Sequence, residues 1–189
     1  MSKQRAKVFC LEGLWSSRLT DRRSARPLLE TLERVGAIES LWASIPNEDA
    51  LAAVLRSWAQ RQYDRYSIGY LAFHGEPGFI ILERRKVSLD ELAELIGSRC
   101  RGKVIYFGAC ETLNIPGAQV EAFRRATGAK AVVGYTKQVD WLESGSFELL
   151  LLEALTSLRI DAAERWMLRR HGQFSTLLGL KFVRGRAPD

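Results

Sequence analysis

Two reactive side chains, His74 and Cys110, each follow a predicted strand. His74 comes directly after the apolar run Ser67–Phe73, and Cys110 follows the run Lys103–Phe107 with only Gly108 and Ala109 between. A cysteine thiolate is a strong nucleophile, and a nearby imidazole can take up the thiol proton and later deliver it to a leaving amine. The two positions therefore suggest a thiol–imidazole pair.

Strands and helices alternate along the chain, which predicts how this pair is positioned. Helices of 10 to 15 residues between short strands indicate an α/β fold with a mostly parallel sheet covered on both faces. Parallel strands present their carboxyl ends at one edge of the sheet, so His74 and Cys110 meet there if their strands are neighbours. No linker divides the sequence, and residues 1–189 are expected to form one domain. The expected strands are Val8–Leu14, Leu41–Ile45, Ser67–Phe73, Lys103–Phe107, Ala131–Gly134 and Leu177–Val183, with a hairpin arm at Gly78–Leu82 and helices near 24–35, 48–62, 88–97, 117–127, 147–158 and 161–170.

Glycines flank both reactive residues. Gly75 allows a backbone N–H to approach a substrate closely, and Gly108 permits a sharp turn before Cys110. We expect the N–H groups of Gly75 and Cys110 to form an oxyanion hole, in which each donor typically contributes a few kcal/mol.

The composition indicates the cellular environment of the protein and the cofactors it is expected to lack. The three cysteines show no CxxC spacing, which favours a reducing, cytoplasmic environment. The first residues are too polar for a signal peptide, and the apolar run Phe147–Leu158 is short and interrupted by Glu148 and Glu153, so no membrane association is expected. Neither a metal-ligand cluster nor a glycine-rich nucleotide fingerprint is visible in the sequence, so no metal or cofactor is expected.

The chain is basic, with a formal net charge of +6 and a sequence pI near 9.5. Its arginines are scattered over a loop and several helices, which favours solvated surface charge. A nucleic-acid-binding surface through the loop and the helix from Arg165 to Arg170 remains an alternative.

The segments YLAFHGEPG and VIYFGACETL resemble the caspase-like superfamily, and most of all its bacterial CHAT-type branch. In that branch one strand ends in His-Gly, and the next ends in a small residue, Ala-Cys and then a Thr, here Thr112. The stretch AVVGYTKQVDWLESGSFELLLLEAL is also similar, and the likeness covers about residues 8–158. The start VFCLEGLW resembles a small bacterial subfamily of stand-alone domains without an established function.

The resemblance implies a three-layer caspase-like fold with a central sheet of about six strands, His74 as general base and Cys110 as nucleophile. Two features depart from caspases. Caspases carry a Gln-Ala-Cys-x-Gly signature where this chain has Phe107-Gly108-Ala109-Cys110-Glu111, and the caspase histidine precedes the cysteine by about 50 residues, which is farther than here. The arm between the two residues is therefore shorter.

Substrate selection has several candidates. By resemblance, Arg22 or Arg23 would bind an acidic substrate side chain through a bidentate pair, whereas Asp140 would bind a basic one. Solvated loop charge is the alternative for all three. Trp141 and Tyr135 either wall a pocket or cover the edge of the core.

The sequence thus predicts a cysteine endopeptidase acting on a protein or peptide, in bacterial defence or regulated proteolysis. Control by a regulatory partner or by homodimerisation is an open alternative. A non-catalytic caspase-like binding module is the second hypothesis, and nucleic-acid binding is the third.

Overall fold

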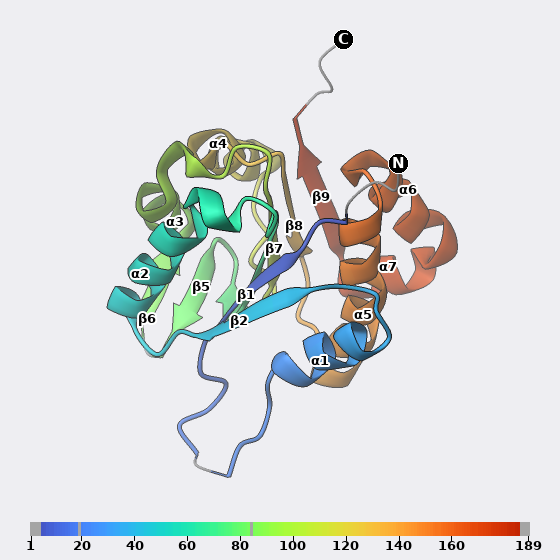
Figure 1. The fold of residues 1–189 in the computed structure, drawn as a ribbon, viewed down its shortest axis with the longest axis horizontal. Coiled ribbons are helices and arrows are strands. Elements are labelled where there is room, and N and C mark those ends of the chain that lie inside the picture. Colours follow the sequence, from blue (N-terminus) through green and yellow to red (C-terminus); the bar gives the residue numbers. More distant parts are fainter. Residues whose placement is uncertain (1–4, 19, 84, 186–189) are drawn as a thin grey trace.

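The computed structural model describes residues 5–18, 20–83 and 85–185. Its centre is a six-stranded sheet in the order β2-β1-β3-β7-β8-β9 (Figure 1). The first five strands in this order are parallel, and β9 pairs antiparallel with β8, which confirms the expected mostly parallel sheet. The strands are β1 (Val8–Glu12), β2 (Ser40–Ser44), β3 (Ile68–Ala72), β7 (Val104–Gly108), β8 (Ala131–Tyr135) and β9 (Leu180–Arg184).

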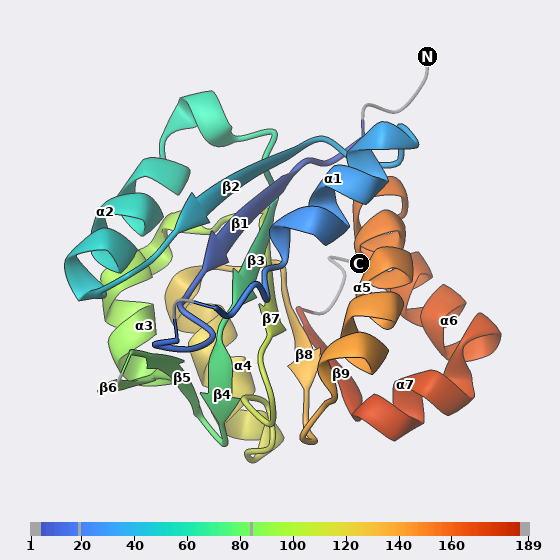
Figure 2. The same cartoon turned by 90° about the horizontal axis from the view of Figure 1, so that it is seen from below.

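Helices cover both faces of the sheet, so the predicted three-layer architecture is confirmed (Figure 2). Side chains of a strand alternate between the two faces. In β1, Phe9 and Leu11 join one core, and Val8 and Cys10 join the other. The first core includes α2 (Glu48–Trp58), α3 (Leu89–Ile96) and α4 (Gly117–Thr127); the second includes α1 (Arg26–Arg34), α5 (Trp141–Ser157), α6 (Ile160–Arg170) and α7 (Gly172–Leu178). Short 3-10 turns occupy Arg61–Tyr63 and Gly97–Arg99.

The predicted hairpin arm is a small antiparallel sheet of its own, made by β4 (His74–Glu76), β5 (Phe79–Leu82) and β6 (Arg85–Ser88). It continues directly from β3, so His74 is the first residue of the arm. Ser88 ends the arm and caps α3 reciprocally with Glu91 in a capping box.

Several boundaries differ from expectation. Helix α2 ends at Trp58 instead of continuing to 62, and two other differences have a visible cause. Helix α5 begins at Trp141, well before the apolar run, because the Asp140 carboxylate accepts hydrogen bonds from the N–H groups of Leu142 and Glu143 and so satisfies the first turn. Leu177, expected in the last strand, instead lies in α7, which ends at Gly179 in the left-handed conformation (φ +67°). Within the described residues, α5 and the other helices are all too short or too polar to cross a membrane.

Candidate active site

The strand register brings three segments to the same edge of the sheet. Glu12 at the end of β1 pairs with Ala72 at the end of β3, which in turn pairs with Gly108 at the end of β7. His74 and Cys110 each lie two residues beyond this level, after the neighbouring strands β3 and β7. The sequence-based expectation that they leave the same edge is therefore confirmed.

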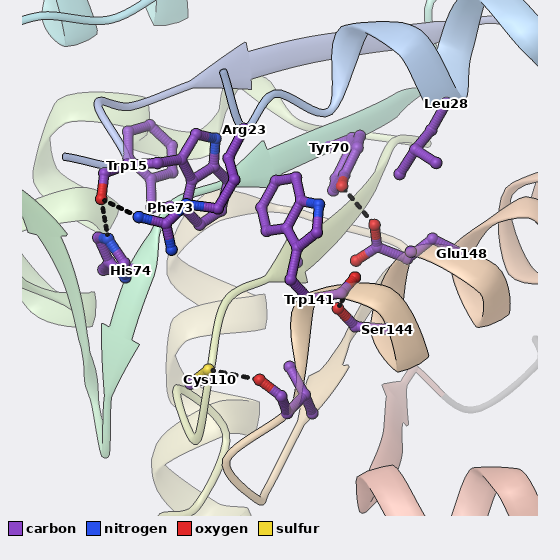
Figure 3. A pocket seen from close by; sticks show the side chains of 13 residues that line it. Trp15, Arg23, Leu28, Tyr70, Phe73, His74, Cys110, Trp141, Ser144 and Glu148 are labelled. Atoms are coloured by element: carbon purple, nitrogen blue, oxygen red, sulfur yellow. Dashed lines mark hydrogen bonds between the residues drawn. The ribbon is translucent and has the colours of Figure 1, made fainter. Parts of the chain in front are cut away.

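His74 and Cys110 line one pocket, with a volume of about 170 Å³ (Figure 3). The loop from β1 to α1, the segment around Cys110 and the start of α5 surround it. The residues that line it are Trp15, Arg23, Leu28, Tyr70, Phe73, His74, Gly108, Cys110, Val139, Trp141, Ser144, Gly145 and Glu148.

His74 is oriented by a backbone carbonyl. Its Nε2 lies 2.8 Å from the carbonyl oxygen of Trp15, and the two rings meet edge to face at 5.2 Å between centroids (Figure 3). A carbonyl oxygen only accepts hydrogen bonds, so Nε2 must carry the proton. In the neutral ring Nδ1 then keeps its lone pair and is the nitrogen that can accept a proton from a thiol.

Cys110 is partly exposed, and its Sγ donates to the carbonyl oxygen of Val139 at 3.7 Å. The next residue, Glu111, has a positive φ of 53°, which is uncommon for a residue with a side chain, and its N–H donates to the Lys137 carbonyl at 3.0 Å. Within the described residues no hydrogen bond joins Cys110 to His74. Catalytic hydrogen bonds are often long without substrate and tighten when it binds.

Gly75 packs directly against the nucleophile's segment. A Cβ atom at this position would lie 2.4 Å from both the Cys110 carbonyl oxygen and Thr112 Oγ1. Thr112, the threonine of the resembling motif, is fully buried and donates to the Phe79 carbonyl at 3.1 Å. Together these contacts fix the arm to the Cys110 segment. The oxyanion role of the Gly75 and Cys110 N–H groups remains a prediction.

The pocket floor carries a buried acid that sequence reasoning missed. Glu148 on α5 is 4% exposed and accepts hydrogen bonds from Tyr70 at 2.6 Å and from Tyr106 at 2.8 Å. Burial raises the pKa of Glu148 to about 7, although the tyrosine hydroxyls oppose the rise. The one sequence signal for this site was a glutamate that interrupts an apolar helix.

Gly108 serves close packing. A Cβ atom there would lie 2.4 Å from the Tyr70 ring and 3.0 Å from Glu148 Oε1. Gly108 is the last residue of β7, and its φ is not among the positive values. The sharp turn expected at Gly108 falls instead at Glu111, the residue with the left-handed backbone.

The predicted substrate-binding residues lie at different places. Arg23 lines the pocket, where it binds Asp21 through Nε and Nη2 and holds the pKa of that carboxyl at about 2. Arg22 lines an adjacent hollow together with Trp42. Asp140 caps α5 beside the pocket. Their roles toward substrate remain predictions.

The two candidate aromatic walls have different outcomes. Trp141 lines the pocket and meets Trp15 edge to face at 4.6 Å. Tyr135 is wholly buried, and its hydroxyl is hydrogen-bonded to the hydroxyl of Tyr106, so of the two alternatives it belongs to the core and not to the pocket wall. Trp15, whose carbonyl orients His74, had no signal in the sequence because a backbone acceptor is independent of residue type.

The other two thiols lie in the core. Cys10 and Cys100 are buried, and burial raises the pKa of Cys10 well above its usual value and that of Cys100 to about 12. Both thiols are therefore protonated and shielded at neutral pH. Cys110 is the partly exposed cysteine of the chain.

A model described as "Family of unknown function (DUF6642)" matches residues 5–183. No curated protein matches the chain significantly. Among solved structures, a secreted C11 cysteine protease from Bacteroides thetaiotaomicron, in complex with an irreversible peptide inhibitor, has a TM-score of 0.57 and 12% sequence identity. The match covers 86% of this chain but only 57% of that chain. At this identity the likeness shows a shared caspase-like fold.

Proposed function

We propose that this chain, which belongs to the DUF6642 family of unknown function, is a cysteine endopeptidase that uses His74 and Cys110. One observation carries the proposal: both side chains line one pocket at the carboxyl edge of neighbouring strands, and a backbone carbonyl holds the His74 ring with Nδ1 as its free acceptor. The shared fold with a C11 cysteine protease supports the same reading.

The proposed chemistry begins when His74 Nδ1 takes the thiol proton and Cys110 Sγ attacks the peptide carbonyl carbon. The resulting imidazolium is stabilised by its Nε2–H bond to the Trp15 carbonyl. It then donates the proton to the leaving amine as the C–N bond breaks. Water, activated by the same ring, hydrolyses the thioester and restores the thiol. The N–H groups of Gly75 and Cys110 are the proposed oxyanion donors.

Peptide cleavage tests this proposal. The protein is incubated with a mixed library of fluorogenic peptides, beside the variants Cys110→Ala, His74→Ala and Cys100→Ala. Cleavage should vanish in Cys110→Ala and fall about 10²- to 10⁴-fold in His74→Ala, the usual contribution of a general base. Cys100→Ala removes a buried core thiol and should keep the activity.

Thiol labelling gives a second, independent readout. In the native protein iodoacetamide should modify Cys110 first, while Cys10 and Cys100 react only after unfolding, because both are buried. Mass spectrometry of tryptic peptides over time measures the order. Equal labelling of all three thiols in the folded protein would contradict the assigned site.

A non-catalytic binding module is the second candidate. It is favoured by the lack of a hydrogen bond between His74 and Cys110 within the described residues. If neither the library nor a thiol probe reveals a Cys110-dependent reaction, this candidate replaces the first.

Nucleic-acid binding is the weaker alternative. Arg165 on α6 already forms an ion pair with Asp161, and Arg184 on β9 forms one with Glu164. Binding of a nucleic acid that weakens steeply with added salt would support this alternative.

The remaining parts of the proposal concern the cellular compartment, the family branch and the biological role. The CHAT-type motifs and the three free thiols support a bacterial, cytoplasmic protease of the CHAT-type branch, acting in defence or regulated proteolysis. Activation by a regulatory partner or by homodimerisation is part of the same proposal. Light scattering with and without a peptide inhibitor would report the oligomeric state.

A further inference from the structure

We infer that the pocket beside Cys110 selects a substrate side chain of the lysine or arginine type, and that Glu148 is the residue that selects it. The inference rests on the proposed function and names the substrate class of the same site. Its elements are the walls, the floor and the mouth of the pocket.

The walls of the pocket are apolar. Trp15 and Trp141 face each other edge to face at 4.6 Å between ring centroids, and Phe73 and Leu28 continue the lining (Figure 3). Such a lining suits an aliphatic stem, whose transfer from water contributes about 0.8 kcal/mol for each buried CH₂ group. A short acidic side chain has no such stem to bury.

The floor supplies one carboxyl group without a counter-ion. Glu148 is bound by the hydroxyls of Tyr70 and Tyr106, and no cationic side chain within the described residues pairs with it. An unpaired buried carboxylate is costly, and the raised pKa of Glu148 reflects this cost. A cationic group entering the pocket would provide the missing partner.

One glycine of the pocket lining, Gly145, keeps space open on the same helix as this carboxyl. Gly145 lies inside α5, where glycine costs about 1 kcal/mol relative to alanine. A Cβ atom there would meet only Leu28 methyls, at 3.5 and 3.7 Å, so packing does not require the glycine. Gly145 therefore leaves room in the pocket. Gly108, in contrast, is required by close packing, because a Cβ atom there would lie 2.4 Å from the Tyr70 ring and 3.0 Å from Glu148 Oε1.

The cation at the mouth does not oppose this selection. Arg23 also lines the pocket, but its guanidinium is bound to the Asp21 carboxylate at 2.6 Å. The Arg23–Asp21 pair is neutral overall. The uncompensated group of the pocket is therefore the acid on its floor.

Matched alkylating probes test the inference. Four peptidyl chloromethyl ketones carry lysine, arginine, norleucine or glutamate next to the ketone and are otherwise identical. Alkylation forms the bond from Cys110 Sγ to the probe's methylene carbon and releases chloride, and mass spectrometry measures its rate. The lysine and arginine probes should react at least about tenfold faster than norleucine, and glutamate should be slowest.

Variants assign the preference to Glu148. In Glu148→Gln, which keeps the shape and a hydrogen-bonding head, the ratio of lysine to norleucine rates should fall to about one. Glu143→Gln changes an exposed acid five residues earlier on α5 and should keep the wild-type ratio. Circular dichroism and thermal unfolding confirm that each variant is folded.

The outcomes separate the two proposals. Equal rates for lysine and norleucine, or a preference that survives Glu148→Gln, would overturn the role of Glu148 while the peptidase proposal stands. Cys110 left unmodified by every probe would overturn the peptidase proposal. In that case binding of N-acetyl-lysine methylamide and its norleucine analogue to Cys110→Ala, followed by NMR, still decides the pocket: equal binding refutes the inference.

Discussion

At Gly75 the arm and the Cys110 segment approach so closely that a side chain cannot be placed between them. The obstacles are the Cys110 carbonyl oxygen and Thr112 Oγ1, each 2.4 Å from an added Cβ. A backbone oxygen cannot rotate away as a flexible side chain can. The close approach of the arm to the Cys110 segment therefore requires a residue without a side chain at position 75.

Gly75→Ala should accordingly destabilise the protein by about 1–3 kcal/mol, the usual cost of overpacking, and slow the alkylation of Cys110. Gly117→Ala is the matched control, because a Cβ at this exposed helical position meets nothing within 4 Å. Urea unfolding measures the stability of both variants. Wild-type stability and labelling in Gly75→Ala would show that the two segments are not held in this contact.

Single residues were predictable from the sequence where they follow apolar strands, as His74 and Cys110 do. Glu148 was not, because its partners Tyr70 and Tyr106 lie on other elements and meet it only in the folded chain. The Trp15 carbonyl was hidden for a different reason, since every residue type carries one.

Among the elements, α5 contributes most to the pocket, through Trp141, Ser144, Gly145 and Glu148. Its first turn depends on Asp140, whose carboxylate accepts two backbone N–H bonds. The cap explains why the helix starts before its apolar run. The sequence pattern could not reveal this start, because Asp140 and Trp141 read equally well as a loop.

Asp140→Ala should lower the free energy of unfolding by about 1 kcal/mol, whereas Asp140→Asn, an equally good cap, should stay within a few tenths. The pair of variants also separates capping from charge. If Glu148 selects the substrate, Asp140→Asn keeps the preference for the lysine probe. A preference lost in Asp140→Asn at unchanged stability would instead assign substrate binding to Asp140.

For the molecule as a whole, the buried acid makes stability depend on pH. The pKa of Glu148 is raised from 4.5 to about 7, so the folded state holds this proton more tightly than the unfolded chain. Such a group stabilises the fold fully below about pH 4.5, and its contribution is lost as the pH rises through 7. The neighbouring Tyr70, Tyr106, Tyr135 and Cys10 all have pKa values raised by burial, and Glu12 also faces the cluster.

Wild type should therefore lose stability relative to Glu148→Gln between about pH 4.5 and 7, by up to about 3 kcal/mol. Denaturant unfolding of both proteins across this range measures the difference, and their shared groups, Glu12 included, cancel. A difference that stays constant with pH would show that Glu148 does not titrate in this window.

The overall architecture was the most predictable level. Alternating apolar strands and helices indicated the parallel sheet, and α4 covers the expected residues 117–127 and is followed by Gly128 with a φ of +71°. The order of the strands in the central sheet could not be read from the pattern, because it depends on pairing between distant segments; the arm pairs locally and was expected as a hairpin, although without its third strand. The arrangement of the two sheets decides which residues surround His74.

One buried carboxylate, Glu12, fastens both ends of the loop over the pocket: it accepts hydrogen bonds from Trp15 at the start and from Ser24 and Ala25 at the end. When both ends of a loop are held in this way, the residues between them can be replaced without changing the positions of the ends. The stretch between Trp15 and Ser24 is thus a natural place to graft sequences of other lengths. Grafts there would reshape the entrance to the pocket and leave the sheet and His74 in place.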